Sequence, residues 1–240
     1  MPSLSLPRHE TGREDQPAAE GGSLRKFAYE QIEALLNTGE LKPGQLFSQR
    51  ELVQRTGATL GSIREAVPRF EAEGLLVTVP KKGLMVPSLD VAFVRDAYQV
   101  RLMIECAAVP FMIERLEEKT LQKMIEGQNR LVAELEAGGG NAEPQLLNRI
   151  QREDWDMHAT FVRSMGNTLV DNIYRVTAIK IRMVVQSRLR VTSTNAQRIL
   201  KEHNDILKAV MARDLVGTEQ ALRRHLNNSL TIALGGSVAC

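Results

Sequence analysis

Four side chains in the C-terminal two-thirds of the chain are of types that bind metal ions. Asp154 and His158 are four residues apart, a spacing that puts both on one face of a helix. His203 and His225 each lie 11 residues from Asp214, where we expect a short turn between two helices. Each is therefore about 16 Å from the turn and level with the other in an antiparallel hairpin. Facing helices build metal sites from such side chains, so these four residues are predicted to form one.

Simpler interpretations of these residues remain open at this point. An aspartate and a histidine four apart also form an ordinary helix pair, and a lone histidine is usually a surface or hydrogen-bonded core residue. The shared level of His203 and His225 favours the metal. One carboxylate and three neutral imidazoles suit Zn²⁺ first, with Ni²⁺ and Mn²⁺ as alternatives. Four protein ligands can complete a tetrahedral site or leave octahedral positions open for a carboxylate ligand.

A second group of residues, nearer the N-terminus, predicts DNA recognition. Ser48 and Glu51 have the spacing of a capping box at the start of a short helix. A turn at Gly57 follows, and Thr59 can cap a second helix that ends at Gly74. This order is the helix-turn-helix pattern, in which the second helix enters the major groove of DNA.

The residues after Gly74 predict a wing beside the second helix. Residues 75–79 and 84–86 are rich in strand formers and flank a turn with Lys81 and Lys82. A hairpin tipped with lysines can reach phosphate or the minor groove. Pro68 falls inside the second helix, past its base-reading half, and predicts a local kink there.

The elements that must position the metal ligands are long amphipathic segments. The chain beyond residue 87 predicts six helices separated by short breaks, at about residues 90–116, 118–137, 143–165, 168–189, 195–211 and 216–234. The expected fold is mostly α, with an N-terminal winged helix-turn-helix carrying a small β wing and a C-terminal antiparallel all-α bundle of six to seven helices. The predicted domains are a disordered tail, the winged helix, the bundle and a short tail, over residues 1–22, 23–87, 88–234 and 235–240.

Composition narrows the setting in which the protein works. The chain has 240 residues, 43% of them hydrophobic, and a net charge of +2, so DNA affinity must come from a few well-placed cations. No stretch approaches the roughly 18 apolar residues of a membrane span, so no membrane partner is expected. Cys106 and Cys240 follow no disulfide or ligand spacing, which suits a reduced cytoplasmic location.

The N-terminal motifs resemble the winged-helix domain of the GntR superfamily of bacterial transcription regulators. The resemblance rests on the ordered series Leu-Lys-Pro-Gly-Gln-Leu at 41–46, Arg-Glu-Leu at 50–52, Ile-Arg-Glu-Ala at 63–66, Glu-Ala-Glu-Gly-Leu at 71–75 and Gly-Leu-Met-Val at 83–86. It implies DNA contacts from Arg50, Thr59, Ser62, Arg64, Lys82 and Gly83. Leu60 and Gly61 depart from the usual arginine and small polar residue, so the operator sequence of relatives does not carry over.

The C-terminal motifs resemble the FCD effector domain of the FadR branch of that superfamily. These motifs are Asp-Trp-Asp-Met-His at 154–158, Ser-Met-Gly-Asn at 164–167, Glu202-His203 and His225-Leu226. In FCD domains with a metal, residues at the positions of Asp154, His158, His203 and His225 bind it. Arg101 and Glu105 resemble the opening signature of the domain, which implies that Arg101 pairs with a carboxylate of the effector. The alternative is a plain Arg101–Glu105 helix pair. Six helices point to the VanR-like subgroup.

Together these features predict a ligand-responsive, DNA-binding repressor with no catalytic residues. It is expected to be a homodimer on a near-palindromic double-stranded DNA operator, because two helix-turn-helix units must span two half-sites. The expected effector is a small organic acid that shifts the DNA-binding equilibrium. Two alternatives stand beside this: a metal-dependent hydrolase, in which the metal activates water, and a regulator whose metal is purely structural.

Overall fold

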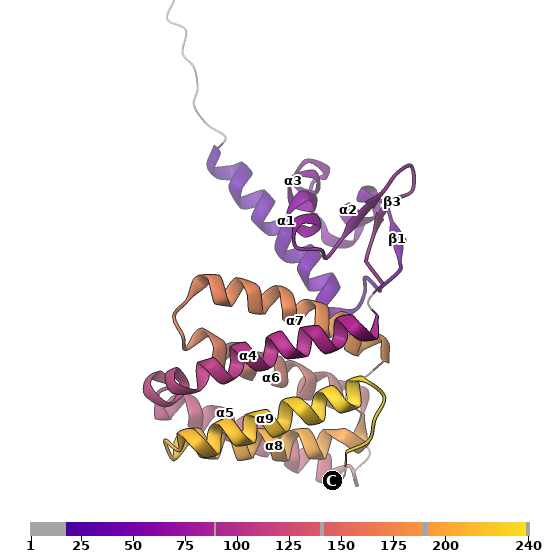
Figure 1. The fold of residues 1–240 in the computed structure, drawn as a ribbon. Coiled ribbons are helices and arrows are strands. Elements are labelled where there is room, and N and C mark those ends of the chain that lie inside the picture. The colour runs from indigo at the N-terminus through magenta and orange to yellow at the C-terminus, as the bar shows by residue number, and fades with distance from the viewer. Residues whose placement is uncertain (1–17, 89, 140–141, 189–191, 239–240) are drawn as a thin grey trace, which may run out of the picture.

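The computed structural model describes residues 18–88, 90–139, 142–188 and 192–238. The N-terminal part is a winged helix-turn-helix, as predicted (Figure 1). A three-stranded antiparallel sheet with the order β1-β3-β2 packs beside its helices. The elements of this part are α1 (Ala18–Thr38), β1 (Leu46–Phe47), α2 (Gln49–Thr56), α3 (Leu60–Ala72), β2 (Val77–Val79) and β3 (Gly83–Met85).

Local capping sets the two helices of the helix-turn-helix. The Ser48 hydroxyl accepts a hydrogen bond from the Glu51 backbone N–H, and Gly57 ends α2 with a φ of 70°. Thr59 caps α3 in the same way as Ser48 caps α2. The predicted second half of the capping box is replaced, because the Glu51 carboxylate pairs with Arg55. α3 continues through Pro68 to Ala72.

Two boundaries in this domain differ from those predicted. β1 was not expected from the sequence, because two residues are too short for a strand pattern to stand out. Its pairing with β3 makes the predicted hairpin part of a three-stranded sheet. α1 begins at Ala18, inside the segment expected to be a disordered tail, so residues 18–22 of that segment are helical. Residues 1–17 lie outside the described residues.

The C-terminal part is an all-α bundle in which the described residues form six helices, as predicted (Figure 1). Their boundaries lie within about two residues of the expected ones. They are α4 (Val91–Arg115), α5 (Glu118–Ala137), α6 (Pro144–Arg163), α7 (Thr168–Arg188), α8 (Ser193–Met211) and α9 (Leu215–Ala233). None of the described helices combines the length and the apolar character that a membrane span requires.

The helix α7 joins the bundle to the winged helix. It lies on the side of the bundle that faces α1 (Figure 1). Ile179 and Met183 of α7 belong to the hydrophobic core of the winged helix. Arg182 Nη1 donates to Asn37 Oδ1 of α1 at 2.8 Å. The two domains therefore share buried apolar and polar contacts through one helix.

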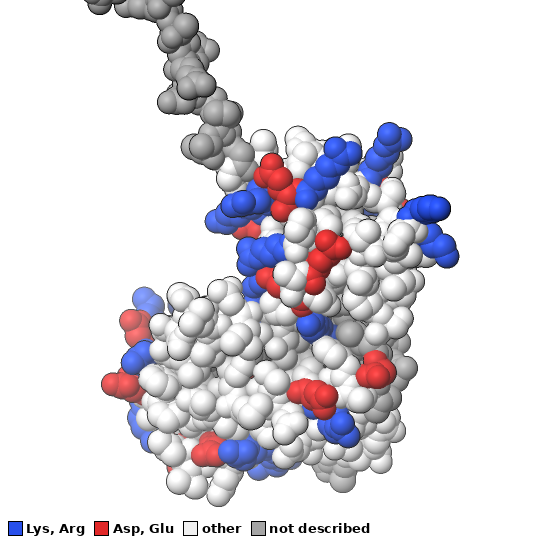
Figure 2. Space-filling model, turned by 45° about the horizontal axis from the view of Figure 1, so that its top comes forward, with Lys and Arg blue, Asp and Glu red and all other residues white. Residues whose placement is uncertain are grey.

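Charged side chains are unevenly placed on the surface. On the face that Figure 2 shows, lysine and arginine gather at the winged-helix end, and the bundle carries both signs in smaller groups. A chain with a net charge of only +2 thus concentrates basic side chains at the end where the helix-turn-helix lies, with acidic side chains among them (Figure 2).

Candidate metal centre and DNA-binding surface

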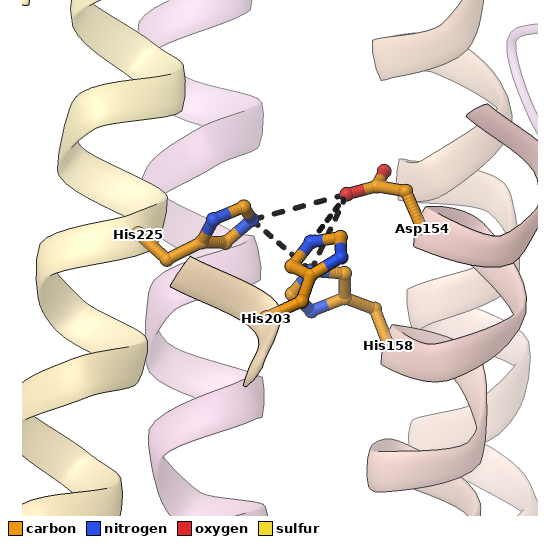
Figure 3. Close-up of side chains that lie close together, drawn as sticks. All are labelled: Asp154, His158, His203 and His225. Carbon is orange, nitrogen blue, oxygen red and sulfur yellow. Dashed lines mark hydrogen bonds and ion pairs between the residues drawn. The ribbon is translucent and has the colours of Figure 1, made fainter. Parts of the chain in front are cut away.

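The four predicted metal ligands come together in the core of the bundle. Asp154 and His158 project from α6, His203 from α8 and His225 from α9, and all four are buried. The Nε2 atoms of His203, His158 and His225 lie 3.0, 3.7 and 3.9 Å from Asp154 Oδ1 (Figure 3). One potential ligand atom from each residue lies within 4.8 Å of the others. The predicted shared level of His203 and His225 is confirmed by a ring separation of 4.7 Å.

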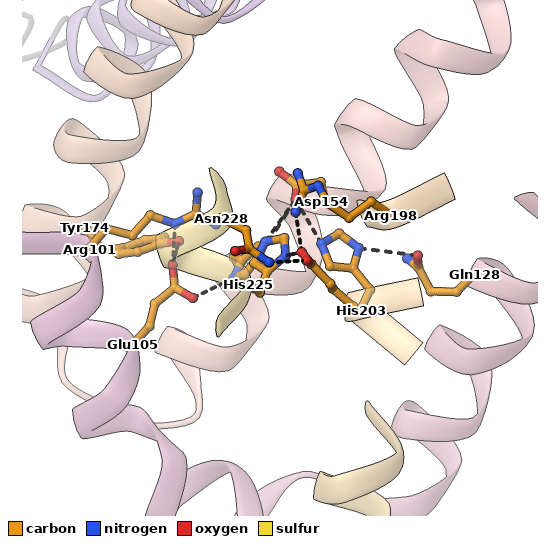
Figure 4. A network of polar contacts seen from close by, with 11 residues as sticks. Arg101, Glu105, Gln128, Asp154, Tyr174, Arg198, His203, His225 and Asn228 are labelled. Atoms are coloured by element: carbon orange, nitrogen blue, oxygen red, sulfur yellow. Dashed lines mark hydrogen bonds and ion pairs between the residues drawn. The ribbon is translucent and has the colours of Figure 1, made fainter. Parts of the chain in front are cut away.

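A polar group lies at Nδ1 of each histidine, and Figure 4 shows Gln128 in this position beside His203. His158 Nδ1 is 2.5 Å from Glu105 Oε2, and His225 Nδ1 is 2.9 Å from Glu202 Oε2. His203 Nδ1 is 3.3 Å from Gln128 Oε1. Because these partners are acceptors, each Nδ1 carries the proton and each Nε2 presents a lone pair to the centre. This is the arrangement that orients histidine ligands on a metal.

Lone pairs of the histidine Nε2 atoms and a carboxylate oxygen of Asp154 face one another at the centre, and a cation would compensate their mutual repulsion. His158 Nε2 and His225 Nε2 are only 3.2 Å apart, and both face a carboxylate oxygen of Asp154. His203 Nε2 is buried, and its close contact with Asp154 is not aligned as a hydrogen bond. Unprotonated nitrogens at this distance repel each other unless a positive charge lies between them. The four residues therefore fit a divalent metal ion.

The ionisation of these groups suits metal binding. Burial raises the pKa of the Asp154 carboxyl, but the neighbouring His203 and His158 rings outweigh it and hold the pKa well below its usual range. Burial lowers the pKa of His203, and it lowers that of His225 to about 3 against the opposing contact with Glu202. A charged carboxylate and neutral imidazoles are the forms that bind a metal at neutral pH.

Arg101 lies beside this centre and is only 2% exposed. Its Nε donates to Glu105 Oε1 at 2.5 Å, so the Arg101–Glu105 pair exists but is buried, unlike an ordinary pair on a helix surface. Its Nη2 is buried without a hydrogen-bond partner among the described residues. Arg101 and Asp154 both line a cavity of about 50 Å³. A donor is thus free to meet a ligand next to the metal centre.

The sequence analysis assigned no role as a histidine partner to the residues that hold the rings. Gln128 and Asn228 belong to the polar network around the centre (Figure 4), and so does Glu202, which contacts His225 and Asn228. Arg198 pairs with Glu202 with the same spacing as Arg101 pairs with Glu105. That repeated Arg-x-x-x-Glu spacing was visible in the sequence, but the burial that makes it informative was not.

Most of the predicted DNA-contacting side chains lie on the surface of the winged helix. Arg50, Thr59, Arg64 and Lys82 are exposed, and Arg64 Nε is 3.4 Å from Gln49 Oε1 of α2. Ser62 is the exception. It is buried, its hydroxyl donates to the Thr59 carbonyl and accepts from the Thr59 hydroxyl, and so its side chain completes the start of α3 instead of facing outward.

Gly83 has a structural reason to be glycine. Its φ is 111°, and a Cβ atom there would lie 2.6 Å from the Phe47 carbonyl oxygen of β1. No other residue allows the wing and β1 to approach so closely. Any DNA contact at this position is therefore made by the backbone.

Comparisons with known proteins agree with this architecture. The family described as "Bacterial regulatory proteins, gntR family" matches residues 24–86, and the family described as "FCD domain" matches residues 96–228. The second match alone spans more than half of the chain.

Individual relatives cover both domains at low identity. An uncharacterised HTH-type transcriptional regulator of Bacillus subtilis, YdhC, is 24% identical over 204 residues, which are 83% of this chain and 86% of the relative. The Escherichia coli HTH-type transcriptional repressor GlaR is 25% identical over 207 residues, 81% of this chain and 88% of that protein. The solved structure of E. coli McbR/YncC has the same fold, with a TM-score of 0.76 at 17% identity, over 88% of this chain and 97% of the other.

Proposed function

Because the chain belongs to the GntR family of bacterial regulatory proteins and carries an FCD domain, we propose that this DNA-binding transcription regulator is a repressor released from DNA by a small carboxylate. The families and the relatives are transcription regulators, so the chain is not an enzyme, and the hydrolase alternative falls. The repressor role is supported by the name of the E. coli relative GlaR. The regulator is proposed to act on DNA in the cytoplasm.

DNA binding is proposed to involve two copies of the chain. Each winged helix offers one recognition helix, so a homodimer would read a near-palindromic operator with two half-sites. Arg64 is proposed to reach base edges or phosphate from α3, and Arg50 and Lys82 are proposed to contact the DNA backbone. Their exposure on one basic end of the molecule supports this assignment (Figure 2).

The metal centre is proposed to hold one divalent transition ion, with zinc as the first candidate. The observation that carries this proposal is the convergence of three histidine Nε2 atoms on Asp154 Oδ1 while polar groups hold every Nδ1. A bound ion would supply a positive centre that accepts carboxylate oxygens. Nickel and manganese accept the same ligands.

The effector is proposed to lie in the cavity between Arg101 and the metal centre. Arg101 is one of the residues that line that cavity, and its Nη2 is buried and free of a hydrogen bond within the described part of the chain. A carboxylate there would satisfy a donor that otherwise costs about 1–3 kcal/mol to leave unpaired. This need for an anion also distinguishes the proposal from a purely structural metal, which would leave Arg101 Nη2 unpaired.

The helix α7 is proposed to carry the response to the DNA-binding domain. Tyr174 of α7 donates to Glu105, which holds both Arg101 and His158. Arg175, the next residue, bonds to α1 and to the end of α3. A ligand that moves Glu105 would act on the winged helices through these two residues. It must prefer one arrangement of the dimer, since equal affinity for both would shift nothing.

The test combines operator selection with ligand release. Duplexes selected from a random-sequence library on the full-length, zinc-loaded protein should be near-palindromic. Fluorescence anisotropy should then show that at least one acid in a panel of small carboxylates weakens operator binding. Arg101→Ala should remove this effect while preserving the metal content and the affinity for the operator without acid. A panel that leaves operator affinity unchanged would reject ligand-controlled release, and an unchanged response in Arg101→Ala would reject the proposed pocket.

A further inference from the structure

Arg198 stands in the same relation to the metal centre as Arg101 does. Arg101 pairs with Glu105, whose other oxygen holds His158, and Arg198 pairs with Glu202, which holds His225. Each arginine lies four residues before its glutamate on its own helix, Arg101 on α4 and Arg198 on α8. Both side chains are more than nine-tenths buried. The centre is thus flanked by two Arg–Glu–His chains, which differ in that Arg198 and His225 share one oxygen of their glutamate.

Both arginines have a donor left over beside the same cavity. Arg101 Nη2 and Arg198 Nε are buried atoms that find no hydrogen-bond partner among the described residues. Both residues line the cavity of about 50 Å³ that also includes Asp154 (Figure 4). Because buried donors normally have a partner, two guanidinium groups with unpaired donors beside one cavity favour a ligand that offers a hydrogen-bond acceptor to each of them.

The need of Glu202 for a partner does not explain the burial of Arg198. Glu202 Oε2 already accepts a hydrogen bond from His225 Nδ1, and Oε1 accepts one from Asn228 Nδ2 at 2.6 Å. Burying a guanidinium costs free energy that a neighbouring carboxylate only partly offsets. A second anion in the cavity would give this charge a direct partner.

The charges around the centre point to a dianion. Three buried or half-buried guanidinium groups lie around it, those of Arg101, Arg198 and Arg182. Arg182 interacts electrostatically with Asp154, and its guanidinium packs on the Trp155 ring. Three buried carboxylates balance them, each in contact with an arginine or a histidine: Glu105, Asp154 and Glu202. With a divalent ion bound, the three guanidinium groups and the three carboxylates leave a net charge of two positive charges, which a dianion would neutralise.

We propose that Arg198 is a second anchor for the effector, and that the pocket takes a short-chain dicarboxylate whose two carboxylate groups meet Arg101 and Arg198. This inference rests on the proposed function, which requires only that some small carboxylate binds. The small cavity volume limits the chain between the two groups. Planar guanidinium groups are well matched to carboxylates, so each end gains a charge-assisted hydrogen bond.

The test is calorimetry on the full-length, zinc-loaded protein with matched acids. Malonate, succinate and glutarate are compared with propionate, butyrate and pentanoate, which have the same numbers of carbons but one carboxylate. At least one dicarboxylate should bind about tenfold or more tightly than its matched monocarboxylate. Arg198→Gln should remove this preference, while the affinity for the monocarboxylate changes less than about twofold. Arg198→Lys, which keeps the charge, should retain part of it.

Controls separate the possible failures. Arg223→Gln removes an exposed arginine that also pairs with a glutamate four residues away, and it should behave as wild type. Equal binding of matched acids, or a full dicarboxylate preference in Arg198→Gln, would overturn the inference but leave the proposed function intact. Loss of zinc from both Arg198 variants, measured by mass spectrometry, would assign Arg198 to the metal centre and also overturn it. If none of the acids binds, both this inference and the proposed function fail.

Discussion

Tyr174 and Arg175 are consecutive residues of α7 whose side chains bond to different domains. The Tyr174 hydroxyl donates to Glu105 Oε1 at 2.7 Å, beside the candidate metal centre. Arg175 donates to Glu33 of α1 at 2.6 Å and to Glu73, the C-cap of the recognition helix α3, at 2.8 Å. A displacement of Glu105 would therefore act on Tyr174, and the next residue, Arg175, makes the contacts with α1 and with the end of α3.

Removing the Tyr174 hydroxyl should weaken communication between the two domains. In Tyr174→Phe, operator affinity without ligand should stay close to wild type, whereas the loss of affinity caused by the effector should shrink by about 0.5–2 kcal/mol. Anisotropy titrations with and without effector measure both quantities. Thr177→Ala is the matched control on the same helix, since that hydroxyl donates only to the Ile173 carbonyl. An undiminished effector response in Tyr174→Phe would exclude this route.

Metal should bind at one ion per chain and stabilise the bundle. If the ion is present at 100 to 1,000 times its dissociation constant, chelation should lower the free energy of unfolding by about 3–4 kcal/mol. The variant His203→Ala/His225→Ala should lose the ion, as measured by mass spectrometry on protein without a histidine tag. Asp205→Asn, which changes a half-buried acid of α8 that pairs with Arg224, should retain it. A wild-type metal content in the double variant would disprove the site.

Arg64 should contribute to sequence-specific DNA binding. Truncation to alanine should cost about 1–3 kcal/mol of operator affinity, measured by anisotropy, because the side chain is exposed at the start of the recognition helix. Arg130→Ala on the exposed surface of α5 is the control. Ser62→Ala should leave the base preference of the operator unaltered, since its hydroxyl bonds within α3. Unchanged affinity in Arg64→Ala would contradict the placement of the recognition helix.

Gly83→Ala should destabilise the wing. The added Cβ would meet the Phe47 carbonyl oxygen at 2.6 Å, and the backbone φ of 111° is itself unfavourable for alanine, so a loss of about 1–3 kcal/mol is expected. Gly57→Ala provides the comparison, because its φ is 70° but the space around it is open. That variant should lose only about 1 kcal/mol. Thermal melts that rank the two variants in the opposite order would refute the close packing of the wing on β1.

The ligand set could be predicted from sequence because helix geometry is regular. The spacing of Asp154 and His158 fixes a shared helix face, and equal distances from a turn fix the level of His203 and His225. These rules need no knowledge of how the helices pack. The six bundle helices and the two caps of the helix-turn-helix were predictable for the same reason, since capping and periodicity are local.

Features that depend on packing could not be read in this way. An arginine and a glutamate four residues apart are ordinarily an exposed pair, so Arg198 could not be recognised as important before its burial was known. Ser62 matches the family position for a DNA contact, yet the direction of its side chain is set by Thr59. β1 exists because β3 offers it a partner, and two residues carry no strand signal of their own.

Ile179 and Met183, which belong to the bundle in sequence, complete the hydrophobic core of the winged helix. A fragment that ended at residue 88 would lose both side chains and expose the apolar surface that they cover. We therefore expect the two domains recognised in the sequence to unfold as one cooperative unit, so that heating melts the chain in a single transition. A chimaera that exchanged the winged helix for that of a relative would need to carry the matching residues of α7 with it.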